Sequence, residues 1–400
     1  MSSARDLLTV CVSAWILAFC RGCKVGLYLS DITAAFDRVF KDFLMAKLLS
    51  AGVANVFLDF LSSYLEPRVG RVAVGGVLSD LITLDDMVFQ GTVLGPVLWN
   101  TFFNDVADAA SWHGGTPETF ADDLAVHKCF DKDVDNSIIE LNLKHTHEKV
   151  HHWGRRHRVE FDETKEKVVI LHPTVGVGDD FKYLGCLVDS QLRMSSAVDH
   201  ILSWARPKVK ALIRTRTMYD KKTMLQQYKT HIWGGTEYAN GAILHACDTV
   251  LSRIDRLQQH FLDELHLTAE VAFLDFNFAP ATLRRDIGIL GFIHKRVLGL
   301  CHPGIERLLP FLGSTGPWHD KQLESHTGQC LYRHSLFFKS LFGHVCVYNR
   351  LQPYLVEMKT VKEFQRKLTA IARSRCLSGI DQWSLSFHSE SHMWRVRFAI

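Results

Sequence analysis

Three aspartates stand where β elements are expected to end, and carboxylates placed in this way can hold divalent cations. Asp31 follows the apolar run 25–30, whereas Asp122 and Asp123 fall at the tip of a hairpin expected over 118–128. In an antiparallel sheet, a hairpin beside a strand can bring Asp31 near Asp122. Converging carboxylates repel each other unless a cation lies between them, and hard oxygen ligands suit Mg²⁺ or Mn²⁺. Two such ions can activate a 3′-hydroxyl and stabilise a leaving pyrophosphate.

Each candidate segment also has an ordinary structural explanation when it is taken alone. Aspartates are common at strand ends and in turns, where water solvates them. The segment 90–96 brackets a turn with Gln90-Gly91 and Gly95-Pro96 before a helix. Backbone can approach a ligand closely at such glycines, but many strand-to-helix turns have the same pattern. Only the occurrence of these segments together, in order, favours catalysis.

Apolar periodicity predicts the elements that must position these residues. The expected elements are strands over 25–30, 167–172 and 181–189, hairpins over 69–89 and 118–128, two helices within 38–65 broken at Gly52, a helix opening at Gly95-Pro96, and a helix over 133–156. After residue 195 the pattern is mainly helical, and the polar stretch 312–328 is the best candidate for a linker.

The composition is that of a globular protein with nearly balanced charge. The chain has 400 residues, of which 47% are hydrophobic, and 46 basic against 43 acidic residues give a net charge of +3. A disordered, collagen-like or strongly polybasic chain is therefore excluded. Ten scattered cysteines indicate reduced thiols of an intracellular protein, nuclear or cytoplasmic.

The most apolar stretch of the chain runs from Leu7 to Cys20. It is shorter than the roughly 20 residues that a membrane-spanning helix needs. The acidic Asp6 before it argues against a signal peptide, whose leading segment is basic. We therefore expect a packed core helix, and neither a membrane anchor nor a membrane partner.

Five segments, in order, resemble motifs A to E of the reverse transcriptases of non-LTR (LINE-like) retrotransposons: DITAAFDRV (31–39), QGTVLGPVLWN (90–100), FADD (120–123), FDETKEKVVIL (161–171) and FKYLGCLVD (181–189). The stretches 251–265, 284–295 and 340–368 are similar to regions that follow the polymerase in these elements, so the resemblance covers most of the chain.

The resemblance implies the roles of the charged candidates. Asp31, Asp122 and Asp123 match the three aspartates that bind two Mg²⁺ or Mn²⁺ ions in the polymerase palm. Lys165 matches the lysine of motif D, which acts on the pyrophosphate side as a cation or proton donor. A solvated lysine in an acidic and basic run is the alternative for Lys165.

The resemblance also implies which residues contact the incoming deoxynucleotide. Phe36 matches the aromatic steric gate, which fills the space that a ribonucleotide 2′-hydroxyl would need. Gln90 and Gly91 match the residues beside the incoming nucleotide and the template.

The implied fold class is α+β, with a polymerase palm built from an antiparallel sheet with helices on one face, followed by a mostly helical thumb and a C-terminal helical region. The expected domains are a palm with a residual fingers helix over 1–190, a helical thumb or connection over 191–311, a linker over 312–328 and a retrotransposon tail module over 329–400.

The implied function is that of an RNA-directed DNA polymerase, which transfers nucleotides from dNTPs to a DNA primer on an RNA template. The fingers strands before motif A and the endonuclease domain are expected to be missing, because only 30 residues precede Asp31. Without a fingers clamp, positioning of the nucleotide is weakened. The alternatives are a catalytically dead palm that only binds RNA or RNA–DNA hybrid, and a relic without selected function. Nothing in the sequence specifically supports a metal-dependent hydrolase.

Two further clusters have both a functional and a structural explanation. Basic residues between 193 and 222 could follow phosphates or simply face water. The candidates for a grip on nucleic acid are Arg206, Lys208, Lys210, Arg214 and Arg216. His147 and His151 have the i, i+4 spacing of helical metal ligands, but no third ligand stands nearby in the sequence. A polar helix face is therefore the preferred interpretation.

Overall fold

The computed structural model describes residues 3–85, 87–313 and 318–390. The chain forms two compact units. We call Val25–Ile170 the sheet unit, and Met1–Lys24 together with Leu171–Ile400 the helical unit. The chain is mixed helix and sheet, which confirms the α+β class in its coarse form.

The sheet unit is built on four strands in the order β6-β7-β1-β8. These strands are β1 (Cys23–Ser30), β6 (Thr116–Phe120), β7 (Asp123–Asp131) and β8 (Lys167–Leu171). The predicted strands over 25–30 and 167–172 and the hairpin over 118–128 are thereby confirmed, and β6 pairs antiparallel with β7. β1 is buried from Val25 to Ser30, as expected for a central strand.

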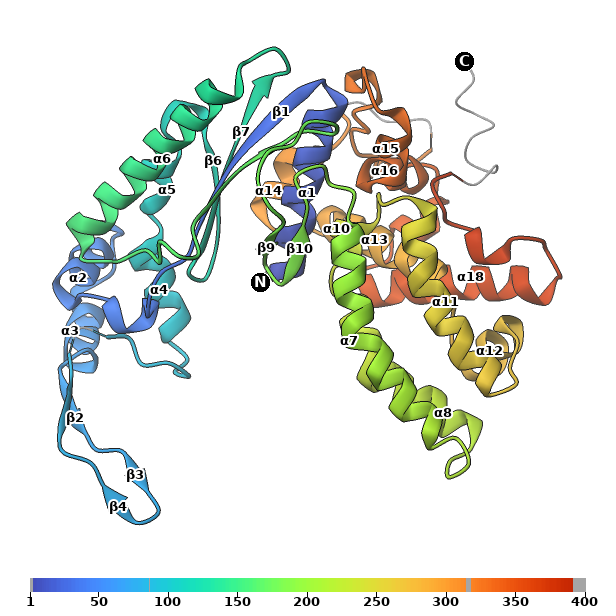
Figure 1. The fold of residues 1–400 in the computed structure, drawn as a ribbon, viewed down its shortest axis with the longest axis horizontal. Helices are drawn as coiled ribbons and strands as arrows, with labels where there is room; N and C mark the ends of the chain where they lie inside the picture. Colours follow the sequence, from blue (N-terminus) through green and yellow to red (C-terminus); the bar gives the residue numbers. More distant parts are fainter. Residues whose placement is uncertain (1–2, 86, 314–317, 391–400) are drawn as a thin grey trace. The chain divides into compact units, whose positions relative to one another are not determined.

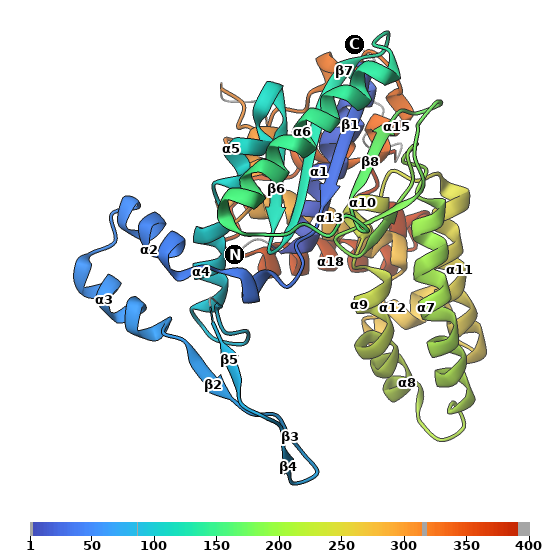
Figure 2. The ribbon, with the colours of Figure 1, turned by 60° about the vertical axis from the view of Figure 1, so that its left-hand side comes forward.

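Two helices, α5 (Val106–Ala110) and α6 (Asn136–His157), pack beside each other and cover this sheet (Figure 2). α6 lies close to β1 at Gly26. A Cβ at this position would come within 2.9 Å of the Ile139 side chain of α6. The apolar residues of α6 that face the sheet include Leu143, Val150 and Trp153. These positions recur at whole turns of a helix with 3.6 residues per turn, and this apolar periodicity predicts the helix over 133–156.

Between β1 and α5, the chain forms the α-helices α2 and α3, then an arm of paired strands, and then the α-helix α4. The helices α2 (Lys41–Ser50) and α3 (Asn55–Tyr64) are separated at Gly52, as predicted. In the arm, β2 (Arg68–Gly70) pairs with β5 (Ile82–Leu84), and β3 (Ala73–Val74) pairs with β4 (Val77–Leu78). Gly75 and Gly76 form its tip with φ of 57° and 82°, which glycine adopts easily. The arm extends away from α3 and from α4 (Gly95–Phe103) in both ribbon views (Figures 1 and 2).

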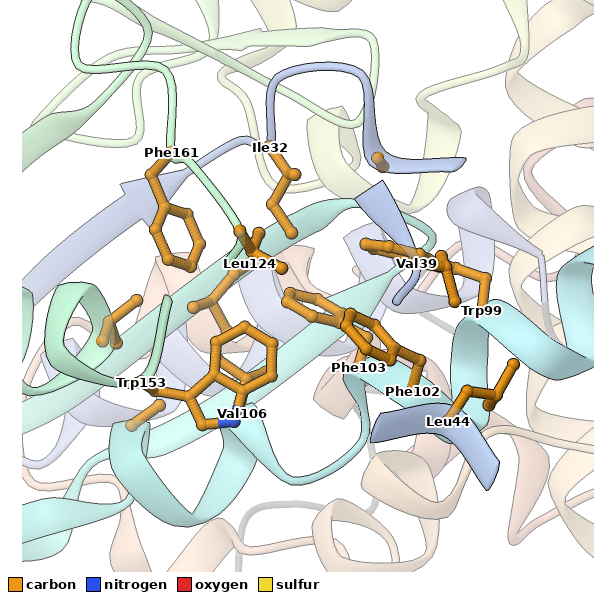
Figure 3. Packing of buried hydrophobic residues seen from close by; sticks show 14 of the residues in the cluster. Ile32, Val39, Leu44, Trp99, Phe102, Phe103, Val106, Leu124, Trp153 and Phe161 are labelled. Carbon is orange, nitrogen blue, oxygen red and sulfur yellow. The ribbon is translucent and has the colours of Figure 1, made fainter. Parts of the chain in front are cut away.

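One aromatic core holds the segments that carry the first four of the five motifs. Its members include Ile32, Trp99, Leu124 and Phe161, each beside one of these motifs (Figure 3). The Trp99 and Phe103 rings stack with their centroids 5.2 Å apart. Since burial of aromatic side chains is the largest apolar contribution to a core, this cluster fixes the motif segments relative to one another.

The helical unit contains a short hairpin and a set of packed helices. The hairpin is formed by β9 (Phe181–Tyr183) and β10 (Cys186–Val188), where the sequence predicts one β element. The longer helices are α1 (Ala4–Cys20), α7 (Ser195–Arg214), α8 (Lys221–Tyr228), α11 (Asp248–Glu264), α12 (Ala269–Phe276), α13 (Ala281–Val297), α16 (Leu341–Tyr348) and α18 (Val361–Leu377).

α1 is a packed helix, as its apolar sequence predicts. Nearly every residue from Asp6 to Cys20 is buried, and Ser3 and Asp6 form a capping box at its start. Within the described residues, the search for a helix with the length and apolar character of a membrane span finds none. The ten cysteines are not joined in disulfides in this structure.

The compact units differ from the domain boundaries expected from sequence. α1 and residues 171–190 pack in the helical unit, so the boundary at residue 190 does not coincide with a structural one. Part of the predicted linker, 314–317, and the end of the predicted tail, 391–400, lie outside the described residues. Beside the first of these gaps, the Leu312 amide donates a hydrogen bond of 2.9 Å to the Gln322 carbonyl. The division into palm, thumb, linker and tail stays a prediction.

Candidate active site

Asp31 lies at the end of β1 and is held by the backbone on both sides. One carboxylate oxygen accepts a hydrogen bond from the Ile32 amide at 2.9 Å. The Asp31 carbonyl accepts a hydrogen bond of 2.9 Å from the Asp162 amide, which joins this strand end to the segment before β8. The other carboxylate oxygen accepts a hydrogen bond of 2.7 Å from the Lys165 ammonium. The structure therefore brings together Asp31 and Lys165, which the sequence separates widely.

Asp122 and Asp123 lie at the turn between β6 and β7. Ala121 adopts the left-handed conformation with φ of 54°, and Phe120 pairs with Asp123 across the turn. The Trp99 indole N–H donates a hydrogen bond of 2.8 Å to the Ala121 carbonyl. Since Trp99 is fully buried, this bond ties the turn to the aromatic core.

Burial and mutual repulsion raise the pKa values of both turn aspartates. Burial is the largest cause for Asp123, followed by the charges of Asp31 and Asp122, and together they raise its pKa to about 6. The pKa of Asp122 is also raised, mainly by burial and further by the charge of Asp31. The Lys165 cation opposes both shifts. The carboxylates from the two strand ends therefore act on each other at one edge of the sheet.

This donor set fits hard divalent cations. Three carboxylates that repel one another are stabilised by Mg²⁺ or Mn²⁺, which prefer oxygen ligands. In the described chain, the oxygens of these three residues do not all lie within 4.8 Å of one another. The Lys165 ammonium, which pairs with Asp31, adds a positive charge beside the three carboxylates.

Phe36, Gln90 and Gly91 lie on neighbouring segments in the same unit. Phe36 belongs to a short 3₁₀ helix (Ala35–Arg38) and packs against Trp99 with ring centroids 5.8 Å apart. Its carbonyl accepts a hydrogen bond of 2.9 Å from the Val88 amide, two residues before Gln90. Gln90 and Gly91 are exposed, and Gly91 has a φ of 80° with open space where a Cβ would be. This turn can therefore accept a ligand close to its backbone.

The predicted basic residues of α7 are exposed in the helical unit. Arg206, Lys210 and Arg214 follow i, i+4 spacing and share one side of the helix, whereas Lys208 lies over the Trp204 ring at 4.9 Å. Arg216 lies just beyond the helix, 3.6 Å from Glu264. These residues are thus not one continuous face.

Sequence reasoning missed several residues that the fold places beside the predicted ones. Arg253 and Arg256 of α11 border a hollow of about 400 Å³ together with Arg206. Arg68 of the arm lies over the Phe89 ring at 4.3 Å, next to Gln90. Helical periodicity in the sequence predicts that Arg253 and Arg256 lie on the same helix. No pattern in the sequence predicts that this helix, α11, packs against α7.

Sequence reasoning also missed a third possible ligand beside the two histidines, the carboxylate of Glu166. Glu166 contacts both His147 and His151, although the sequence gives that pair no neighbouring ligand. The segment before β8 brings this carboxylate against α6, and the expectation of a polar helix face stays a prediction.

Comparisons with known proteins agree with the resemblance in the sequence. Residues 21–188 match the family described as reverse transcriptase (RNA-dependent DNA polymerase). The chain is 28% identical over 249 residues to a probable RNA-directed DNA polymerase from transposon X-element of Drosophila melanogaster, which covers 57% of this chain and 27% of that protein. It is 26% identical over 258 residues to the RNA-directed DNA polymerase from mobile element jockey of Drosophila funebris, covering 59% and 28%.

A shorter match links the chain to another type of element. It is 32% identical over 121 residues to the retrovirus-related Pol polyprotein from type-1 retrotransposable element R2 of Popillia japonica, covering 27% of this chain and 20% of that protein. The matches with the X-element and jockey proteins span about a quarter of the length of those relatives.

Proposed function

We propose that this chain, whose residues 21–188 belong to the reverse transcriptase family and whose relatives come from non-LTR retrotransposons, extends a DNA primer on an RNA template. One observation carries the proposal. The carboxylates of Asp31, Asp122 and Asp123 come from the end of β1 and from the turn between β6 and β7, and burial together with the charge of Asp31 raises the pKa of the other two. Repelling carboxylates around a lysine form a suitable site for cation-assisted nucleotidyl transfer.

The proposed mechanism assigns separate tasks to the acidic residues and to Lys165. Asp31, Asp122 and Asp123 would hold two Mg²⁺ or Mn²⁺ ions, and such ions would supply acidification of the primer 3′-hydroxyl and neutralisation of the developing phosphate charge. The Lys165 ammonium lies 2.7 Å from the Asp31 carboxylate and balances its charge. In the proposed reaction, the Lys165 ammonium would donate a proton to the leaving pyrophosphate or stabilise its negative charge.

The nucleotide pocket is proposed to lie between the Phe36 and Gln90 segments. The Phe36 ring rests on Trp99, so it cannot move aside easily to admit a 2′-hydroxyl. Gln90 and Gly91 present an exposed turn joined to Phe36 through the Val88 amide. In this proposal the sheet with α5 and α6 is the palm, and α7, α8 and α11 belong to the thumb.

The proposed grip on the template and primer is a basic surface on α7 and α11. Arg206, Lys210 and Arg214 form a stripe on α7, and Arg253 and Arg256 extend it on α11 beside Arg206. Cations in a row can follow phosphates, and release of counterions then makes the affinity salt-dependent. The stripe replaces the five-residue grip expected from sequence, since Lys208 and Arg216 lie away from it.

Primer extension on poly(rA)–oligo(dT) with dTTP and Mg²⁺ or Mn²⁺ tests the catalytic proposal. We expect extension by the unmodified chain and none by an Asp122→Asn, Asp123→Asn double variant. Asp133→Asn is the control. Asp133 is exposed in the turn after β7, so this variant removes a negative charge away from the three aspartates of the site. Absence of extension by folded protein with either ion would contradict the proposal and favour a palm that only binds nucleic acid.

A binding measurement tests the basic stripe separately from catalysis. The triple variant Arg206→Ala, Lys210→Ala, Arg214→Ala is expected to bind the hybrid more weakly, with a slope of log affinity against log salt shallower by about 2 to 3. The control is Lys362→Ala, Arg366→Ala, Lys367→Ala, which removes three exposed charges from α18. An equal loss in both variants would mean that the total charge matters and the stripe does not.

A further inference from the structure

We propose that His147, His151 and Glu166 form a binding site for a divalent transition-metal ion of the Zn²⁺ type, distinct from the aspartate site. Within the described residues, this is the set of His, Cys, Asp or Glu side chains whose three ligand atoms all lie within 4.8 Å of one another. The site lies inside the sheet unit, where α6 packs against the segment that leads into β8.

The geometry of the three side chains is that of converging ligands. His147 and His151 stand one turn apart on α6, and their ring centroids are 4.0 Å apart. The Nε2 atom of His151 lies 2.7 Å from one Glu166 oxygen, and the Nε2 atom of His147 lies 3.1 Å from the other. Both imidazoles thus direct the same nitrogen toward one carboxylate, so small side-chain shifts would bring three ligands around an ion.

The chemistry of the donors selects the class of ion. Two imidazole nitrogens with one carboxylate are a ligand set that proteins use for Zn²⁺, leaving the fourth tetrahedral position to water. Mg²⁺ and Ca²⁺ prefer oxygen ligands and are disfavoured here. The His147 side chain is 37% exposed, whereas those of His151 and Glu166 are 17% and 11% exposed, so solvent can reach the site from the His147 side.

Two residues of β1 donate hydrogen bonds to the Glu166 carboxylate and hold it in place. The Tyr28 hydroxyl donates a hydrogen bond of 2.6 Å to Glu166, and the Ser30 hydroxyl donates to the same oxygen at 3.2 Å. Outer contacts of this kind fix the orientation of a metal-binding carboxylate and strengthen the site. The same contacts also suit a metal-free cluster in which Glu166 accepts hydrogen bonds from four side chains, and the experiment below separates these two cases.

An ion here would fix the part of the chain that carries Lys165. Glu166 follows Lys165 directly, and the amides of both residues donate hydrogen bonds to the Asp162 carbonyl, at 2.9 Å for Lys165 and 3.2 Å for Glu166. Binding of Glu166 to an ion on α6 would therefore restrict this turn relative to the sheet. The metal would act as a positioning device for Lys165, which contacts Asp31 on the other side of the turn.

Titration of the chelator-treated full chain with Co²⁺ tests the site independently of any polymerase activity. We expect one ion per chain with the visible absorption of tetrahedral Co²⁺, displaced by Zn²⁺. His147→Asn is the main variant, because this partly exposed residue can be replaced with little risk to folding, and it should weaken Co²⁺ binding at least about tenfold. His151→Asn and Glu166→Gln should do the same, with circular dichroism as the check on folding.

Two controls decide whether the ion binds elsewhere. His152→Asn replaces an exposed histidine on another side of α6 and should leave the spectrum unchanged. The Asp122→Asn, Asp123→Asn variant should also keep it. The proposal is overturned if the folded unmodified chain gives no tetrahedral spectrum, or if His147→Asn keeps it unchanged. It is also overturned if the band shows thiolate ligands, or if loss of Asp122 and Asp123 abolishes binding.

Discussion

The contact between Asp31 and Lys165 joins two segments that the chain separates by more than a hundred residues. The other two carboxylates of the candidate site, those of Asp122 and Asp123, come from a third segment. At the scale of single residues, the site is therefore a balance between three repelling carboxylates and one exposed cation. The pKa of Lys165 is raised, chiefly by its hydrogen bond to Asp31, so this side chain stays protonated at neutral pH.

Replacement of Lys165 by alanine is expected to slow extension by about a hundredfold, as loss of a general acid does. The melting temperature should change little, because exposed ion pairs contribute little to stability. Single-nucleotide extension kinetics and a thermal melt measure the two effects. The matched control is Lys167→Ala, two residues away and also exposed. An equally active Lys165→Ala protein would reduce Lys165 to a solvated partner of Asp31.

Replacement of Phe36 by alanine is expected to relax selection of the sugar. The phenyl ring fills space beside Trp99, and its removal opens room for a 2′-hydroxyl. Incorporation of rTTP relative to dTTP should rise at least about tenfold, measured as the ratio of the two kcat/KM values. Phe36→Tyr retains the ring and serves as the control. An unchanged ratio in the alanine variant would place the sugar elsewhere.

At the scale of elements, the C-terminal end of α6 depends on a close approach to the segment before β8. A Cβ on Gly154 would come within 2.8 Å of the Phe161 ring and of the Val159 carbonyl oxygen. α6 ends at His157, and the next residue, Arg158, adopts the left-handed conformation. The chain can therefore turn back at once and bring Phe161 and Glu166 against the helix.

The Gly154→Ala variant is expected to lose about 1 to 3 kcal/mol of unfolding free energy, because the added methyl group overpacks this contact. Urea denaturation followed by circular dichroism measures the loss. Gly288→Ala is the comparison, since Gly288 lies in α13 with open space around it, and that variant should gain about 0.5 to 1 kcal/mol. Equal stability of the Gly154 variant and the unmodified chain would mean that α6 can move away freely.

At the scale of the whole molecule, buried histidines make the chain sensitive to acid. Burial lowers the pKa of His245 to about 4, although its ring lies 2.8 Å from the Leu192 carbonyl oxygen. Burial also lowers the pKa of several other histidines, namely His157, His172, His294, His302 and His319. Their protonation therefore favours the unfolded chain.

The sign of the pH dependence follows from His245. Between pH 6.5 and about 4 the unfolded chain binds more protons than the folded one, so stability falls as the pH falls through this window. His245 alone accounts for about 3 kcal/mol when that window is crossed completely. His245→Gln should therefore lose less stability between pH 7 and pH 4.5 in urea denaturation than the exposed-site control His260→Gln. Identical losses in both variants would exclude His245 as a cause.

The sequence alone determined the local elements and the identity of the catalytic candidates. Apolar periodicity predicted β1, α6 and the paired strands around Asp122, because alternation and helical spacing are written in neighbouring residues. The order of the motifs pointed to the reverse transcriptase family, whose model matches residues 21–188. The two-residue turn at Gly75 and Gly76 was likewise predictable, since positive φ favours glycine.

Only the tertiary structure decided which distant side chains meet. The contacts of Lys165 with Asp31 and of Glu166 with His147 and His151 depend on how packed segments align. The same is true of Arg206, which borders one hollow together with the α11 arginines. No spacing in the chain encodes these pairs. Likewise, α1 joins the helical unit although it directly precedes β1, because burial of its apolar surface is satisfied there. Local pattern fixes an element, whereas its partners are fixed by burial and shape across the whole fold.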